Sequence, residues 1–91
     1  MNQPVKIVDC TLRDGGYYCD WVFDNTLVNN YLNAMNLSAV DIVEIGFRFT
    51  PKSKFLGPYA YTTDTFLESL TLPERLTYAV MVNAKDYCSC D

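Results

Sequence analysis

A guanidinium, a carboxylate and two glycines stand together near the start of the chain, in the stretch D-C-T-L-R-D-G-G. Arg13 supplies a cation and Asp14 an anion, while Gly15 and Gly16 leave backbone amides uncovered because they have no side chain. Together these groups suit a site for an anion, a metal ion or both. The Asp-Gly pair is also a strong signal for a tight hairpin turn, for which residues 17–23 could provide the returning strand.

A second carboxylate lies inside the apolar run D-I-V-E-I-G of residues 41–46. Alternation along a strand divides this run into two faces, with Ile42, Glu44 and Gly46 on one and Val43, Ile45 and Phe47 on the other. Burying the carboxylate of Glu44 is costly unless it is paired or bound to a ligand. Two interpretations stay open: a structural ion pair with Lys6 or Arg48, or a contact with Arg13 near the strand ends.

Two apolar runs and the segment between them predict the elements that position these side chains. Residues 5–10 are rich in β-branched and apolar side chains and predict a buried strand, and residues 41–46 predict a second one. Between them lies an amphipathic helix, which Asp24 or Asn25 could cap. Its apolar residues recur at helical spacing: Val28, Tyr31, Leu32 and Met35. A connection through a helix makes the two strands parallel.

The second half of the chain repeats this alternation. Residues 47–61 predict a long loop, because they contain residues that interrupt regular structure: Pro51, Gly57 and Pro58. Residues 63–70 predict a short helix, since Thr65 and Glu68 have capping-box spacing. Residues 76–83 predict a third strand. The order β-α-β-α-β indicates an α/β fold with parallel strands.

The position of the first candidate residues fits such a fold. Ligands of parallel α/β sheets bind outside the carboxyl ends of the strands, and Arg13 and Asp14 follow the first predicted strand directly. In a barrel of such units the strand ends share one rim, so Arg13 and Glu44 could converge there.

Composition and charge restrict the possible partners. The 91 residues are 49% hydrophobic and 20% charged, which indicates a folded globular domain. A net charge of -4 and the lack of a Lys or Arg cluster argue against nucleic acid as a partner. No apolar run approaches the roughly 18 residues that span a bilayer, and the first residues lack a secretory pattern. We therefore predict a cytoplasmic protein without membrane contact.

The four cysteines, Cys10, Cys19, Cys88 and Cys90, show no spacing typical of a disulfide framework. In a chain without a secretory signal they are expected to be reduced thiols. Cys88 and Cys90 could form half of a metal clamp, but the sequence contains no histidine and no second close cysteine pair to complete it.

Three stretches together carry a family resemblance: D-C-T-L-R-D-G-G after the first strand, V-E-I-G-F at the second, and the G-P-Y-A-Y-T-T-D segment. They resemble the N-terminal part of the metal-dependent aldolase and hydroxymethylglutaryl-CoA lyase-like TIM barrels. This family includes 4-hydroxy-2-oxovalerate aldolase, isopropylmalate and homocitrate synthases and the pyruvate carboxyltransferase domain. The aldolase-like members are the most similar.

The resemblance implies roles for individual residues. Asp14 would be a ligand of Mg²⁺ or Mn²⁺, and Arg13 would contact the enolate oxygen of a pyruvate-like 2-oxo acid substrate. Glu44 would orient the arginine or the waters of the metal, and Gly15 and Gly16 would let the backbone approach the substrate. A Lewis acid and a fixed guanidinium both stabilise the oxyanion that develops when a carbon–carbon bond next to a carbonyl is cleaved or formed.

The sequence also departs from the family pattern. Family members bring two histidine metal ligands from a later strand, and the chain has no histidine. Where hydroxy-oxovalerate aldolases carry a histidine base, it has Tyr17 and Tyr18; either could act as acid or base, but with a pKa near about 10 a tyrosine is more often a packing residue.

A complete (β/α)₈ barrel needs about 250 residues, so residues 1–91 are expected to be one partial domain, the first three strands and two helices of a longer enzyme. Such a piece would be inactive alone. It would associate with itself or with the remainder of the barrel, because one sheet face with Ile7 and Ile42 and both sheet edges would be open. The alternative is a non-catalytic βαβαβ module for interaction or assembly.

Overall fold

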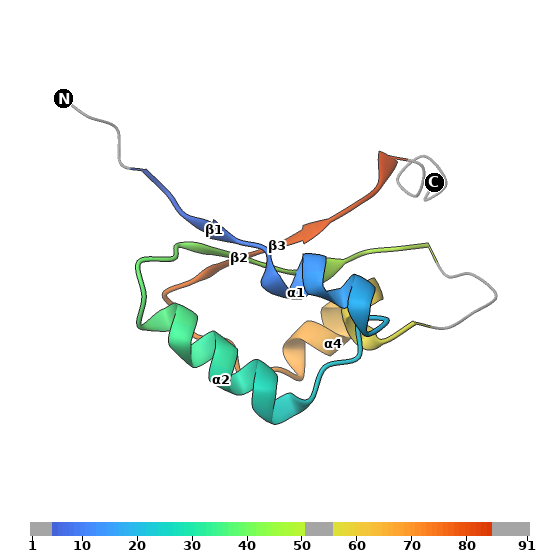
Figure 1. The fold of residues 1–91 in the computed structure, drawn as a ribbon, viewed down its shortest axis with the longest axis horizontal. Coiled ribbons are helices and arrows are strands. Elements are labelled where there is room, and N and C mark those ends of the chain that lie inside the picture. Colours follow the sequence, from blue (N-terminus) through green and yellow to red (C-terminus); the bar gives the residue numbers. More distant parts are fainter. Residues whose placement is uncertain (1–4, 51–55, 85–91) are drawn as a thin grey trace.

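The chain folds into a small α/β unit whose sheet carries helices on one side (Figure 1). A computed structural model describes residues 5–50 and 56–84. The elements are β1 (Val8–Asp9), α1 (Thr11–Gly15), the 3₁₀ helix η1 (Gly16–Tyr18), α2 (Asn25–Asn36), β2 (Ile42–Phe47), α3 (Pro58–Tyr61), α4 (Asp64–Glu68) and β3 (Thr77–Met81). The predicted strands and the two predicted helices are all present.

The sheet has three strands in the order β1-β2-β3. Both pairs of neighbours are parallel, with Val8 opposite Ile42 and Val43 opposite Tyr78. The prediction of an α/β fold with a parallel sheet is therefore confirmed. Because the strands run the same way, their carboxyl ends lie at one edge of the sheet.

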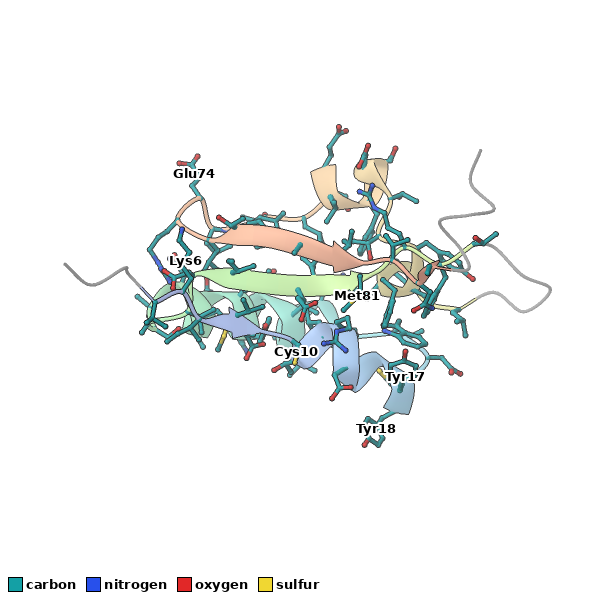
Figure 2. The ribbon with its side chains drawn as sticks, turned by 90° about the horizontal axis from the view of Figure 1, so that it is seen from above. Lys6, Cys10, Tyr17, Tyr18, Glu74 and Met81 are labelled. Atoms are coloured by element: carbon teal, nitrogen blue, oxygen red, sulfur yellow. The ribbon has the colours of Figure 1, made fainter. Side chains whose placement is uncertain are left out.

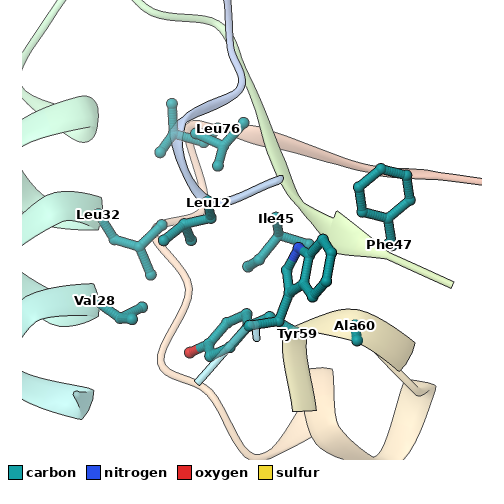
Figure 3. Packing of buried hydrophobic residues seen from close by; sticks show 10 residues of the cluster. Leu12, Val28, Leu32, Ile45, Phe47, Tyr59, Ala60 and Leu76 are labelled. Carbon is teal, nitrogen blue, oxygen red and sulfur yellow. The ribbon is translucent and has the colours of Figure 1, made fainter. Parts of the chain in front are cut away.

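Helix α2 follows the predicted periodicity. Asp24 is its N-cap, and the carboxylate accepts hydrogen bonds from the backbone N–H groups of Thr26 at 2.8 Å and Leu27 at 3.2 Å. Of the two caps that the sequence allows, Asp24 is thus the one used. Val28 and Leu32 are each 1% exposed, and Figure 3 shows them pointing from the helix toward Leu12 and Leu76.

The apolar face of β2 forms the other wall of the core. Val43 and Ile45 are fully buried and Phe47 is 2% exposed, as the alternation predicts. The register against β3 shifts between Glu44 and Gly46. We expected Gly46 to share the face of Glu44, and this expectation is wrong: a Cβ on Gly46 would lie 2.2 Å from the carbonyl oxygen of Tyr59 in α3. The irregularity rotates the strand and lets α3 approach its backbone.

The first strand is shorter and more exposed than predicted. It comprises two residues instead of six, and Val8 is 51% exposed. The preceding Ile7 is 46% exposed. Among the described strands, β1 has only β2 as a neighbour. Figure 2 looks onto the sheet from the side away from α2, where no described helix covers the strands. The apolar run of residues 5–10 correctly predicts a strand, but the burial of that strand requires a covering layer that the described residues do not supply.

The segment after β2 is less irregular than predicted. Within residues 47–61, Gly57 is the N-cap of α3 and Pro58 occupies its first turn. Pro58 therefore begins a helix here, because its fixed φ and missing N–H suit a first helical turn. Pro51 lies outside the described residues.

The cap of α4 also differs from the expectation. Thr63, in extended conformation, accepts the N–H of Phe66 at 3.1 Å. Thr65, which we expected to act in a capping box, lies inside the helix.

Two sequence expectations concern thiols and membranes. Cys10 and Cys19 are free thiols, as predicted, whereas Cys88 and Cys90 lie outside the described part of the chain. None of the helices within residues 5–50 and 56–84 has the length and apolar character needed to cross a bilayer.

Candidate functional site

The turn after β1 is a short helix. Asp9 ends the strand and its carboxylate accepts the N–H of Thr11 at 3.0 Å, while the N–H of Asp14 donates to the carbonyl of Cys10 at 2.8 Å. Gly15 and Gly16 have φ values of -64° and -59°. A two-residue hairpin turn needs positive φ, so the hairpin interpretation is wrong. The side chain of Asp9 instead starts a helical turn.

Arg13 and Glu44 meet across the α1–β2 contact, as one of the two interpretations of Glu44 predicts. The Nη2 atom of Arg13 donates to Oε1 of Glu44 at 3.2 Å, and the two side chains are 23% and 16% exposed. This hydrogen bond raises the pKa of Arg13 above its ordinary value, so the guanidinium stays charged. The alternative pairing with Arg48 is wrong, because Arg48 binds Asp64 at 2.7 Å.

The ion pair with Glu44 does not use all the hydrogen-bond donors of the Arg13 guanidinium. Its Nε atom is buried and has no hydrogen-bond partner among the described residues. An unsatisfied buried donor costs about 1–3 kcal/mol. Arg13 thus keeps hydrogen-bonding capacity that the described chain does not use.

Asp14, the predicted metal ligand, does not belong to a cluster of metal-binding side chains in the described residues. Asp14 is exposed on α1, and the described ranges contain no group of three or more His, Cys, Asp or Glu side chains that could hold a metal ion. A divalent cation needs several ligands in order to compete with water. The described residues alone therefore do not fit a metal site.

Trp21 is the residue that the sequence interpretation missed. It is 4% exposed, and its Nε1–H donates to the carbonyl of Arg13 at 3.1 Å. Its ring packs edge-on against Tyr17 and Phe47, with centroids 4.6 and 5.7 Å away. The signal in the sequence is a lone tryptophan shortly after a glycine pair, which predicts close packing of an indole against a backbone without Cβ.

The glycine pair serves this packing at one position only. A Cβ on Gly16 would lie 1.9 Å from the indole ring of Trp21, whereas a Cβ on Gly15 would meet nothing within 4 Å. The packing of Trp21 thus explains why position 16 is a glycine, which the sequence analysis did not foresee. Substrate contact by either glycine stays a prediction.

The two tyrosines lie beyond the carboxyl end of β1 (Figure 2). Tyr17 is 58% exposed and packs against Trp21 and Phe47. Tyr18 is 92% exposed, so the favoured packing role is wrong for Tyr18. A single turn of 3₁₀ helix directs the two adjacent side chains to different surroundings.

Replacing Gly16 by alanine is expected to lower the free energy of unfolding by about 1–3 kcal/mol, because the new methyl group must displace the indole. Gly15→Ala is the matched control. It should raise the free energy of unfolding by about 0.4–1 kcal/mol, since its helical φ suits alanine and the space is open. Urea unfolding followed by circular dichroism measures both. Equal stability of the two variants would contradict the packing of Trp21 on Gly16.

Asp9 links the site to α2. Burial raises the pKa of its carboxyl, but hydrogen bonds from the hydroxyl of Tyr31 and from Thr11 outweigh this effect and the pKa lies below its ordinary value. Burial and the charge of Asp9 raise the pKa of Tyr31, so the phenol stays protonated as the donor. Because the pKa of Asp9 is lower in the folded chain than in the unfolded chain, the ionised carboxylate stabilises the fold. This stabilisation is fully present above the unfolded pKa of about 3.9 and is lost as the pH falls through the folded pKa.

Tyr31→Phe is therefore expected to lower the free energy of unfolding near neutral pH by on the order of 1 kcal/mol. The difference from the wild type should shrink as the pH falls below about 3.9. Urea titrations at several pH values measure it, with Tyr18→Phe as a control at an exposed position. A loss that is independent of pH would show that the hydroxyl does not act through the Asp9 carboxylate.

No protein-family description and no curated protein sequence matches the chain. A solved structure does: the crystal structure described as the "N-terminal domain of a putative aldolase from Bacteroides vulgatus", with 40% sequence identity and a TM-score of 0.82. The chain resembles the N-terminal domain of an aldolase. The match covers 90% of the chain and 27% of the solved chain, so the chain spans about a quarter of that protein's length.

Proposed function

We propose that the chain is the N-terminal part of a carbon–carbon lyase of the aldolase type, which cleaves a 4-hydroxy-2-oxo acid to a pyruvate-like 2-oxo acid and an aldehyde. The observation that carries the proposal is the Arg13–Glu44 pair, which follows β1 in a chain 40% identical to an aldolase domain. We propose further that the strands belong to a (β/α)₈ barrel of the hydroxymethylglutaryl-CoA lyase-like family.

Arg13 has the chemistry that the cleavage requires. A general base takes the proton of the C4 hydroxyl, the bond between C3 and C4 of the substrate breaks to release the aldehyde, and the electron pair of the bond forms the enolate of pyruvate. Protonation of the enolate at C3 then gives pyruvate. A guanidinium that is held in place stabilises the negative oxygen of the enolate without reorganising. Glu44 fixes the guanidinium through Nη2 at 3.2 Å and leaves other donors for the substrate.

Mg²⁺ or Mn²⁺ is the cofactor that we propose for the complete enzyme, where it would act as a Lewis acid. Because the described residues do not form a ligand set, Asp14 would need partners from elsewhere in that enzyme. The 91-residue chain is accordingly expected to bind Mn²⁺ weakly, since one carboxylate competes poorly with water. Calorimetric titration of the chain and of Asp14→Asn measures this. A tight one-to-one site would mean that the ligands lie elsewhere.

The proposed activity is tested by pyruvate release. The complete enzyme, with Mg²⁺ or Mn²⁺ added, should convert a 4-hydroxy-2-oxo acid to pyruvate, and the 91-residue chain alone should not. Pyruvate is followed through reduction by lactate dehydrogenase and NADH. Lack of turnover with every 4-hydroxy-2-oxo acid tried, or full turnover by the short chain, would refute the proposal.

A non-catalytic assembly role is the second candidate. The exposure of Ile7 and Val8 at the edge strand β1 favours it, because open apolar edges invite association. Light scattering after size-exclusion chromatography would show association in either case, so pyruvate release decides between the two functions. A cytoplasmic location is part of the proposal for both.

A further inference from the structure

A pocket of about 260 Å³ lies on the helix side of the sheet, between α2 and α4. Its lining comes from α2, from Tyr59 of α3, and from α4 with the residues that follow it; we call it the α2–α4 pocket. It shares no lining residue with the Arg13–Glu44 pair. Glu44 lies on the face of β2 opposite to the buried Val43 and Ile45, so the pocket is separate from the candidate active site.

The hydroxyl of Tyr59 has no bonding partner in the described chain. Tyr59 is 1% exposed, and its hydroxyl makes no hydrogen bond to any described residue. Figure 3 shows this hydroxyl pointing from α3 toward α2 and Val28, which also lines the pocket. Buried polar groups are nearly always hydrogen-bonded, and a buried tyrosine hydroxyl usually has a partner. Tyr59 therefore brings an unused donor and acceptor to the pocket.

The ring of Tyr59 is held in place by its neighbours. Phe23 packs edge-on against it with a centroid distance of 5.3 Å, and Phe66 does so at 4.9 Å. These contacts keep the hydroxyl from turning to another partner. Burial raises the pKa of Tyr59, so the phenol stays protonated and can both donate and accept a hydrogen bond.

Helix α3, which carries Tyr59, is anchored at both ends. The N–H of Gly57, its N-cap, donates to the carbonyl of Asp20 at 2.7 Å. Asp20 and Trp21 have φ values of 53° and 56°, so the segment that accepts this bond is itself left-handed. At the other end, the buried hydroxyl of Thr62 donates to a backbone carbonyl of β2 at 2.7 Å. The position of the phenol is thus set before any ligand enters.

The mouth of the α2–α4 pocket is polar and uncharged. Asn25 and Asn29 are four residues apart on α2, so their amides lie on one helix face. Ser69 and Thr71 add hydroxyl groups, and all four residues are exposed, whereas Val28 at the base is 1% exposed. Amides and hydroxyls each donate and accept hydrogen bonds. The described lining contains no Lys, Arg, Asp or Glu, so no opposite charge there would compensate an ionic ligand.

Apolar side chains complete the walls. Phe66 and Leu70 are half-buried and line the pocket together with Val28. The volume lies below the about 300–1,000 Å³ typical of sites for drug-sized molecules, so the ligand must be small. A small ring with hydroxyl groups around its edge and C–H groups on its faces matches both the polar mouth and the apolar walls.

We propose that the α2–α4 pocket is a binding site for a neutral monosaccharide, whose hydroxyl groups bond to the amides at the mouth and to the hydroxyl of Tyr59. Neighbouring side chains cover the oxygen of Tyr59, so a hydroxyl of the sugar reaches it after a small shift of the pocket wall. The site lies apart from Arg13 and Glu44, and the proposal does not depend on aldolase activity.

Tyr59→Phe separates a binding role of the phenol from a structural one. Because a buried hydroxyl without a partner destabilises the fold, its removal should raise the urea midpoint of the ligand-free chain. Tyr78→Phe is the matched control: the hydroxyl of Tyr78 donates to the carbonyl of Pro73 at 2.5 Å, so its removal should lower the midpoint. A lower midpoint for Tyr59→Phe as well would show that this hydroxyl already has a partner, and would overturn the proposal.

Calorimetric titration of the 91-residue chain with D-glucose, D-galactose and D-xylose measures binding. At least one of these sugars should bind saturably, and D-glucuronate should bind at least about tenfold more weakly than the best of them, because its charge has no partner in the pocket. Tyr59→Phe should weaken binding of that sugar by about three- to tenfold. Asn29→Ala should also weaken it, whereas Asn30→Ala, next to it on α2 but outside the pocket, should not.

The same titrations with the complete enzyme test whether the pocket stays accessible when the rest of the protein is present. The sugar and the variants should give the same pattern there, whether or not pyruvate is released. Lack of saturable binding of all three sugars to the complete enzyme, equal binding of D-glucuronate, or an affinity that Tyr59→Phe leaves unchanged overturns the assignment. A resident water molecule would then be the partner of Tyr59.

Discussion

Turnover of the complete enzyme is expected to fall by a factor on the order of 10² when Arg13 is replaced by lysine. Lysine keeps the positive charge but loses the rigid planar arrangement of donors, so it cannot hold Glu44 and the enolate oxygen in the fixed geometry that the guanidinium provides. The hydrogen bond between Arg13 and Glu44, at 3.2 Å, fixes the direction of the guanidinium that lysine would lack. Pyruvate release under saturating substrate measures the effect, and binding of the metal should change little.

Arg75→Lys is the matched control for this substitution. Arg75 also uses several donors, but it binds the carbonyl oxygens of Met35, Asn36 and Ser38 at the C-terminal end of α2, away from the candidate site. Its replacement should leave turnover close to that of the wild type. Normal turnover of Arg13→Lys would show that the Arg13–Glu44 pair is structural only.

The second large effect is expected on stability. Leu32→Ala should lower the free energy of unfolding by about 2–5 kcal/mol, because it leaves a cavity between α2 and the sheet. Leu32 is 1% exposed and points from α2 toward Leu12, as Figure 3 shows. Urea unfolding followed by circular dichroism measures the loss.

Leu37→Ala makes the same chemical change at the end of the same helix. Leu37 is 87% exposed, and surface substitutions of this kind usually change stability by less than about 0.5 kcal/mol. Equal losses for the two variants would mean that α2 does not pack on the sheet through Leu32.

The features that the sequence predicts well are those set by neighbouring residues. The cap of α2 at Asp24 and the buried face with Val28 and Leu32 depend on spacing within one helix, and both are confirmed. The parallel order of the strands follows from connection length and handedness. The contact between Arg13 and Glu44 was one of two interpretations of Glu44, which needed a partner because its carboxylate lies in an apolar strand.

The features that the sequence does not predict depend on residues far away in the chain. The exposure of β1 depends on a layer that the described residues do not supply, and the register shift at Gly46 depends on the approach of α3. The left-handed backbone at Asp20 and Trp21 has no local signal, because neither residue type favours positive φ strongly enough to predict it.

The hydrogen bond from Gly57 to Asp20 has a consequence for the order of folding. It joins two segments that lie on opposite sides of β2 in the sequence, and a Cβ on Gly57 would collide with the carbonyl of Trp21 at 2.1 Å. Contacts between distant segments form only after the entropy of closing the intervening loop has been lost. Helix α2 can therefore form early from local interactions, whereas Trp21 reaches its place beneath Arg13 late, after β2 has positioned the segment that carries α3.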